Sequence, residues 1–82
     1  MKIDVFYTGG GITLAEATLD GGRYAVVSTD NPNCISIYNE NEDSVPYMPE
    51  DMVGSFTVED MDAEIKVLYL DMLEALEILK NA

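Results

Sequence analysis

The chain of 82 residues has no histidine, one cysteine and only four basic residues. Without histidine, the Ser–His and Cys–His pairs that activate most enzymatic nucleophiles cannot be assembled. One cysteine without histidine cannot build a structural zinc site. Cys34 has no partner for an internal disulfide, although it can pair between two chains after oxidation. The sequence therefore predicts a non-catalytic protein with no cofactor and no bound metal.

Features of secreted and membrane proteins are also missing from the sequence. Met1 leads directly into a strand-like segment, without the charged and apolar regions of a signal peptide. The longest apolar runs have only a few residues, far fewer than a membrane-spanning helix requires. A single cysteine fits a reducing compartment. We therefore expect a cytoplasmic protein that does not contact a membrane.

Two kinds of segment invite a ligand-binding interpretation but lack the motifs that would define one. Residues 9–11 are consecutive glycines, yet neither G-x-x-x-x-G-K-[ST] nor G-x-G-x-x-G is present, so a hairpin connection is expected. The acidic segments 40–43 and 59–62 do not fit the EF-hand loop, which needs a glycine at its sixth position and a glutamate at its twelfth. We expect no phosphate site and no dedicated metal site, only weak association with Ca²⁺ or Mg²⁺.

The first half of the chain has the pattern of an antiparallel β-meander. Alternating side chains and turn residues delimit four strands, over residues 2–7, 12–19, 23–29 and 35–39. Gly21 and Gly22 supply the positive φ angles that a tight hairpin turn requires. The third of these strands is apolar on both faces, so we expect it inside the sheet.

The second half is predicted to be a surface loop followed by one long helix. Residues 40–56 are polar, acidic and interrupted by prolines, and Pro49 can open one helical turn that Gly54 closes. Residues 58–80 carry apolar side chains at three- and four-residue spacing, and Thr57 is placed to cap this helix. The predicted apolar stripe comprises Met61, Ile65, Leu68, Tyr69, Met72, Leu76 and Leu79.

The expected fold is a single α+β domain over residues 1–82. It consists of a four-stranded antiparallel β-meander followed by one long C-terminal amphipathic helix packed across the sheet. The sheet is expected over residues 2–39, the acidic, proline-containing loop over 40–56 and the helix over 58–80.

Charge is the strongest functional feature of the sequence. The formal net charge is -12, and no basic residue lies from position 24 to position 65. Such a field attracts cationic partners and repels nucleic acid and anionic membranes. We predict a partner-binding surface formed by nine acidic residues: Glu40, Glu42, Asp43, Glu50, Asp51, Glu59, Asp60, Asp62 and Glu64.

We interpret the chain as a binding protein that docks these carboxylates on a basic protein surface. Spaced carboxylates can imitate the phosphates of a nucleic acid and occupy the cationic groove of a nucleic-acid-binding protein. In size and charge, the chain resembles the small acidic inhibitors made by phages and other mobile elements, including some anti-CRISPR proteins and DNA mimics. This resemblance is one of composition and assigns no role to a single residue. The plainer interpretation of the charge is a solubilising surface.

Two other features suggest contacts that do not depend on charge. Val67, Leu70 and Ile78 lie opposite the main apolar stripe and form either isolated surface positions or the seam of a dimer. Residues 45–49 include Tyr47, a type favoured at interfaces, although a loop that packs onto the core explains it equally well. The alternative function is a structural or assembly module, homo-oligomeric through the helix or an exposed sheet edge, with the charge serving solubility.

Overall fold

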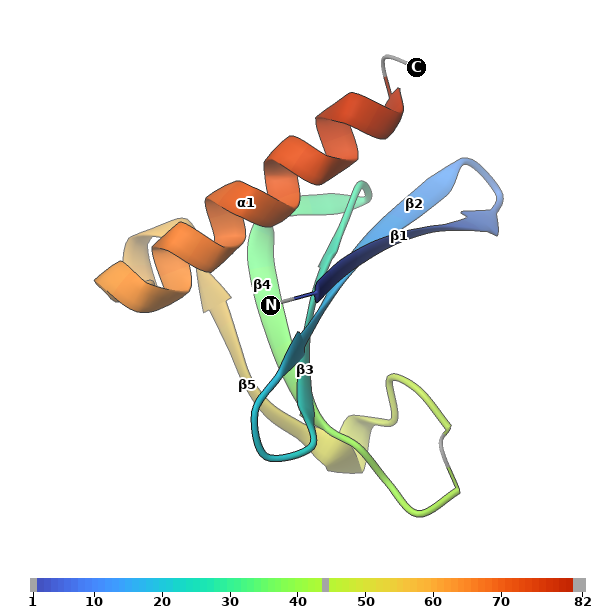
Figure 1. The fold of residues 1–82 in the computed structure, drawn as a ribbon, viewed down its shortest axis with the longest axis vertical. Helices are drawn as coiled ribbons and strands as arrows, with labels where there is room; N and C mark the ends of the chain where they lie inside the picture. Colours follow the sequence, from blue (N-terminus) through green and yellow to red (C-terminus); the bar gives the residue numbers. More distant parts are fainter. Residues whose placement is uncertain (1, 44, 81–82) are drawn as a thin grey trace.

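The protein is a five-stranded antiparallel sheet with one C-terminal helix across one face (Figure 1). This computed structural model describes residues 2–43 and 45–80, with side chains up to Glu77. The strands follow one another along the sheet in the order of the sequence. Their bounds are β1 Lys2–Gly9, β2 Ile12–Leu19, β3 Arg23–Ser28, β4 Asn31–Asn39 and β5 Met52–Thr57. The α+β class and the meander are as predicted, and β3 occupies the expected central position.

The fifth strand corrects the prediction of four strands and an irregular loop over residues 40–56. β5 pairs with β4, and Phe56 lies opposite Ile35 on the inner face of the sheet. The segment was missed because it is short and follows the polar, proline-containing stretch. The helical turn expected at Pro49 is the 3-10 turn η1 (Pro49–Asp51), but Gly54 does not close it and pairs with Ile37 instead.

Glycines form the tight turns that connect the strands of the first two hairpins. Gly10 and Gly11 connect β1 to β2 with φ angles of 62° and 81°, a conformation that side-chain-bearing residues rarely adopt. The triple glycine is therefore a hairpin connection, as expected. β4 begins at Asn31, earlier than the predicted position 35, because the β3–β4 turn needs only Thr29 and Asp30.

The helix α1 (Ala63–Lys80) begins later than the predicted start at Val58. Residues Val58–Asp60 form a separate 3-10 turn, η2. The Thr57 hydroxyl donates to the Asp60 carboxylate at 3.0 Å rather than capping backbone N–H groups. The cap of α1 is Asp62, whose Oδ1 accepts the Ile65 N–H at 2.9 Å. The chain needs these extra residues to turn from the end of β5 onto the inner face of the sheet.

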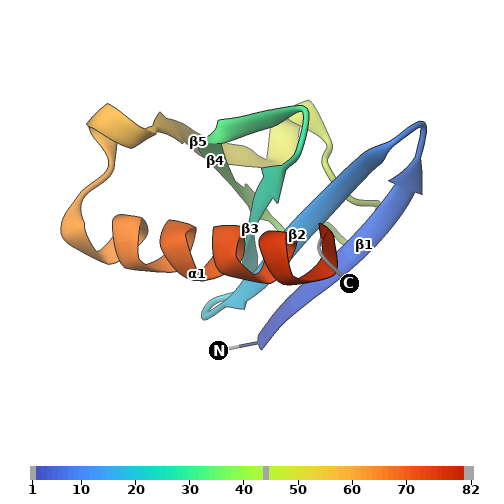
Figure 2. The same ribbon diagram turned by 90° about the horizontal axis from the view of Figure 1, so that it is seen from above.

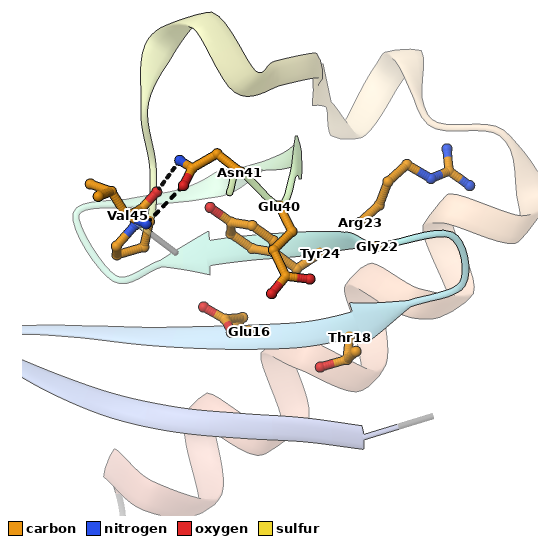
Figure 3. A pocket seen from close by; sticks show the side chains of 9 residues that line it. Glu16, Thr18, Gly22, Arg23, Tyr24, Glu40, Asn41 and Val45 are labelled. Carbon is orange, nitrogen blue, oxygen red and sulfur yellow. Dashed lines mark hydrogen bonds between the residues drawn. The ribbon is translucent and has the colours of Figure 1, made fainter. Parts of the chain in front are cut away.

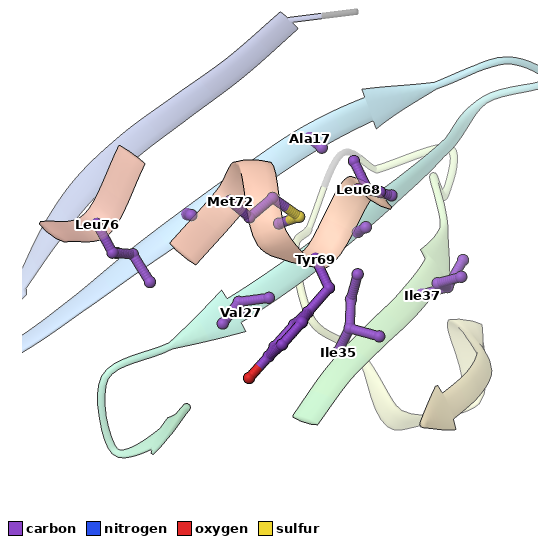
Figure 4. Packing of buried hydrophobic residues seen from close by; sticks show 10 residues of the cluster. Ala17, Val27, Ile35, Ile37, Leu68, Tyr69, Met72 and Leu76 are labelled. Atoms are coloured by element: carbon purple, nitrogen blue, oxygen red, sulfur yellow. The ribbon is translucent and has the colours of Figure 1, made fainter. Parts of the chain in front are cut away.

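The core lies between α1 and the inner face of the sheet, and α1 packs mainly over β1, β2 and β3 (Figures 2 and 4). Three alanines on the sheet, Ala15, Ala17 and Ala25, are fully buried and let the helix approach closely. The remaining core side chains are Val27, Ile35, Ile37, Leu68, Tyr69, Met72 and Leu76. The Tyr69 hydroxyl donates to the Pro32 carbonyl, which gives the one polar group of this core a partner. The predicted stripe from Ile65 to Leu76 thus faces the sheet, whereas Met61 lies before α1 and packs against the core from there. The side chain of Leu79 lies outside the described residues.

Candidate protein-binding surface

The nine acidic residues predicted to contact a partner fall into two groups. The loop group follows β4 and precedes β5, and the helix-start group follows β5 and surrounds the start of α1. All nine are exposed except Asp51, which is half-buried. The loop group is Glu40, Glu42, Asp43, Glu50 and Asp51, and the helix-start group is Glu59, Asp60, Asp62 and Glu64.

The two groups lie at opposite ends of β5. A strand of six residues spans about 20 Å at the usual rise per residue. The predicted single patch is therefore two acidic surfaces with an uncharged strand between them. The residues of each group lie on the same side of β5 along the chain, and the length of β5 determines the distance between the two groups.

Few of the carboxylates are neutralised by neighbouring cations. Among the described side chains the one ion pair joins Lys2 Nζ to Asp4 at 3.8 Å, and it lies outside both groups. Sixteen acidic residues against four basic ones leave a large negative field at the surface. Both groups are therefore suited to a partner that supplies the positive charge.

Internal hydrogen bonds give the loop group a defined shape. The Asn41 side chain donates to the Val45 carbonyl at 2.7 Å and to the Asp51 carboxylate at 2.8 Å, and its oxygen accepts the Val45 N–H at 3.0 Å. The Glu40 N–H donates to the Gly22 carbonyl at 2.7 Å, which joins the start of the loop to the β2–β3 turn. A loop that is already ordered loses less conformational entropy when it binds.

Tyr47 fixes the middle of this loop to the outer face of the sheet. Its N–H donates to the Tyr24 hydroxyl and its own hydroxyl donates to the Glu16 carboxylate, both at 2.9 Å. Its ring packs edge-on against Tyr24 and Tyr38, with both centroids 5.9 Å away. Partial burial, then the hydrogen bond to Glu16 and its negative charge, raise the pKa of the Tyr47 phenol well above its usual value. Tyr47 does not pack onto the core, as one interpretation of residues 45–49 expected; it packs on the outer face of the sheet, opposite α1.

A hollow of about 200 Å³ lies between the β2–β3 hairpin and the loop group (Figure 3). The carboxylates of Glu16 and Glu40 reach it from opposite sides, and Tyr24 forms an aromatic wall. The Arg23 guanidinium is turned away from both carboxylates (Figure 3). Two carboxylates beside an aromatic ring suit an ammonium or guanidinium group.

Sequence reasoning included Glu40 but missed Glu16 and Tyr24. The alternation of β2 and β3 places both side chains on the face opposite the core, which the sequence pattern does indicate. Their proximity to Glu40 depends on the strand register and on the course of the loop, and no local pattern encodes these.

A second, larger hollow of about 570 Å³ lies between the start of α1 and the β2–β3 hairpin. Leu19, Ile37, Ile65 and Leu68 provide its apolar lining, and Asp62 and Glu64 stand among its polar residues. Two members of the helix-start group thus border a partly apolar surface.

The residues predicted as possible oligomer contacts lie on α1. Val67 and Leu70 are 61% and 54% exposed on α1, while the side chain of Ile78 lies outside the described residues.

Over residues 2–43 and 45–80, no helix is long and apolar enough to cross a membrane. The same part of the chain places no three carboxylate or thiol side chains around a metal-sized position.

Comparisons with protein-family models, with curated proteins and with solved structures each found no match to this chain.

Proposed function

We propose that this chain is a non-catalytic binding protein that docks its acidic groups on a basic protein surface. The observation that carries the proposal is the near absence of compensating cations: eight of the nine acidic residues are exposed, and no described lysine or arginine pairs with either group. Exposed single-sign charge accelerates association with a surface of the opposite sign.

A nucleic-acid-binding protein is the class of partner that this charge distribution favours. Such proteins hold rows of lysine and arginine that neutralise phosphates. The loop group and the helix-start group offer negative charge at two places about 20 Å apart, the approximate length of β5. Occupation of such a groove would make the chain an inhibitor that competes with nucleic acid.

The first prediction tests this electrostatic docking. Glu42 and Asp43 are exposed members of the loop group, and the double variant Glu42→Lys/Asp43→Lys should slow association with a captured basic partner about tenfold, with a smaller effect on dissociation. The control is Glu74→Lys/Glu77→Lys, which makes the same charge change at exposed positions of α1.

Partners are captured from a bacterial lysate at low salt, eluted with NaCl, and their binding rates measured by surface plasmon resonance with duplex DNA as competitor. Docking in a nucleic-acid groove requires that DNA displace the chain from its partner. It also requires that the association rate of the loop variant fall more than that of the control. Equal losses in both variants, or retention of no basic protein, would refute the proposal.

The alternative is a homo-oligomeric assembly module, which the exposure of Val67 and Leu70 favours. An apolar self-interface persists as ionic strength rises, whereas docking on a basic partner weakens steeply. Light scattering over a concentration series in moderate salt separates the two, since a strict monomer eliminates the assembly module.

A further inference from the structure

β5 is an edge strand whose outer side pairs with no other strand among the described residues. It pairs with β4 alone, and Figure 1 shows it at the margin of the sheet. Alternate residues of an edge strand direct their backbone N–H and C=O groups away from the sheet, where another strand can pair with them.

β5 also lacks the residues that usually protect an edge. Its sequence, Met-Val-Gly-Ser-Phe-Thr, contains no charged residue and no proline, whereas the opposite edge, β1, carries Lys2 and Asp4. A register shift leaves Val53 as a bulge, and the regular pairing with β4 runs from Gly54 to Thr57. The regular part of this edge is open to strand addition.

Acidic residues stand at both ends of this uncharged edge. Glu50 and Asp51 directly precede β5, while Glu59 and Asp60 follow it after Val58 alone. An extended segment paired along β5 would therefore have an uncharged centre and meet negative charge at each end. Lysine or arginine at its two ends would complement both groups at once.

Charge disfavours a second copy of the chain at the same edge. Antiparallel pairing of two β5 strands would bring the loop group of one copy toward the helix-start group of the other, and parallel pairing would oppose identical groups. Both arrangements oppose like charges, which destabilises strand pairing.

We propose that the free edge of β5 binds an extended partner segment with cationic ends by strand addition. This proposal rests on the proposed function, because it specifies how a basic partner is held. Main-chain hydrogen bonds supply binding along the edge, and the acidic groups at its ends select for the charge pattern of the segment.

The test uses the full chain and three synthetic peptides. The first has two lysines at each end of a Thr-Val repeat. The second is the same peptide with N-methyl groups at adjacent central positions, which block both of its edges. The third carries all four lysines at one end. We expect the first to bind about tenfold more tightly than either of the others at low salt. It should also slow amide hydrogen exchange at those residues of 54–57 whose N–H groups point away from β4.

Variants of the chain supply matched controls. Val53→Lys places a charge beside the edge at a residue that is 53% exposed, and Val67→Lys makes the same change at a residue of α1 that is 61% exposed. Val53→Lys should weaken binding of the first peptide about tenfold, while Val67→Lys leaves its dissociation constant nearly unchanged.

Each further outcome contradicts a definite part of the argument. Equal binding of all three peptides without slowed exchange would refute strand addition and leave electrostatic docking standing. Failure of every lysine peptide to bind would count against both proposals. If the outward-facing N–H groups of residues 54–57 exchange slowly in the free chain and sedimentation shows a dimer, the edge belongs to a second copy and the proposal is overturned.

Discussion

At the scale of single residues, Tyr47 is the non-glycine residue with a positive φ angle in the part of the chain that the structure describes. Its φ of 61° is in the left-handed region, which costs a bulky residue about 1–3 kcal/mol. Two hydrogen bonds and two aromatic contacts oppose this cost, and they fix the loop group to the sheet. The position of the middle of the loop thus depends on the backbone and side-chain contacts of one residue.

Removing the Tyr47 hydroxyl should lower the free energy of unfolding. Tyr47→Phe keeps the ring but deletes the hydrogen bond to Glu16, so we expect a loss of about 1 kcal/mol in urea denaturation. Tyr7 is 69% exposed, and its hydroxyl makes no hydrogen bond to a described residue, so Tyr7→Phe is the matched control and should leave stability unchanged. Equal stability of both variants and the parent chain would show that the hydrogen bond contributes nothing.

The raised pKa of Tyr47 predicts a loss of stability at alkaline pH. Below the usual phenol pKa of about 10, Tyr47 is neutral in both the folded and the unfolded states, so its stabilisation is fully present. As the pH rises above that value, the unfolded state ionises first, and the free energy of unfolding falls. Tyr47→Phe should show a shallower decline in denaturation measured from pH 8 to about 11. Parallel pH profiles would contradict this prediction.

At the scale of elements, Asp62 rather than Thr57 determines where the helix begins. Asp62→Ala should cost about 1 kcal/mol of unfolding free energy, because it removes the acceptor for the Ile65 N–H. Asp62→Asn retains a good cap without the charge and should cost less. Thr57→Ala should have a smaller effect than Asp62→Ala, since Thr57 makes no backbone cap. Chemical denaturation of the three variants tests this order. A larger loss of unfolding free energy in Thr57→Ala than in Asp62→Ala would show that Thr57 caps the helix, as the sequence predicted.

At the scale of the whole molecule, repulsion between carboxylates opposes the compact state. With a net charge of -12 and one ion pair among the described residues, added salt should screen more repulsion than attraction. We expect the melting temperature to rise by about 5 °C between low and moderate NaCl, equivalent to about 1 kcal/mol for a domain of this size. Calorimetry in chloride salts measures this change, and a melting temperature that falls would contradict it.

The sequence pattern predicted those strands and turns whose conformation depends on residues close together in the chain. Turn glycines and alternation were enough for β2, and the doubly apolar centre of β3 indicated its interior place in the sheet. β5 was missed because its pattern is brief, and its stability as a strand comes from pairing with β4. The start of α1 was misplaced because Thr57 has a capping sequence, but the turn that follows it is the separate 3-10 turn η2 and its hydroxyl donates to Asp60 instead of accepting backbone N–H groups.

The sequence by itself determined the charge of this protein, the absence of histidine chemistry and the apolar stripe that faces the sheet, because these depend only on which residues are present and how they are spaced. Only the tertiary structure decided that the acidic residues form two groups, that Glu16 lies near Glu40, and that β5 is the exposed edge between the groups. The physical reason is that these relations join residues far apart in the chain, and strand pairing and register bring them together.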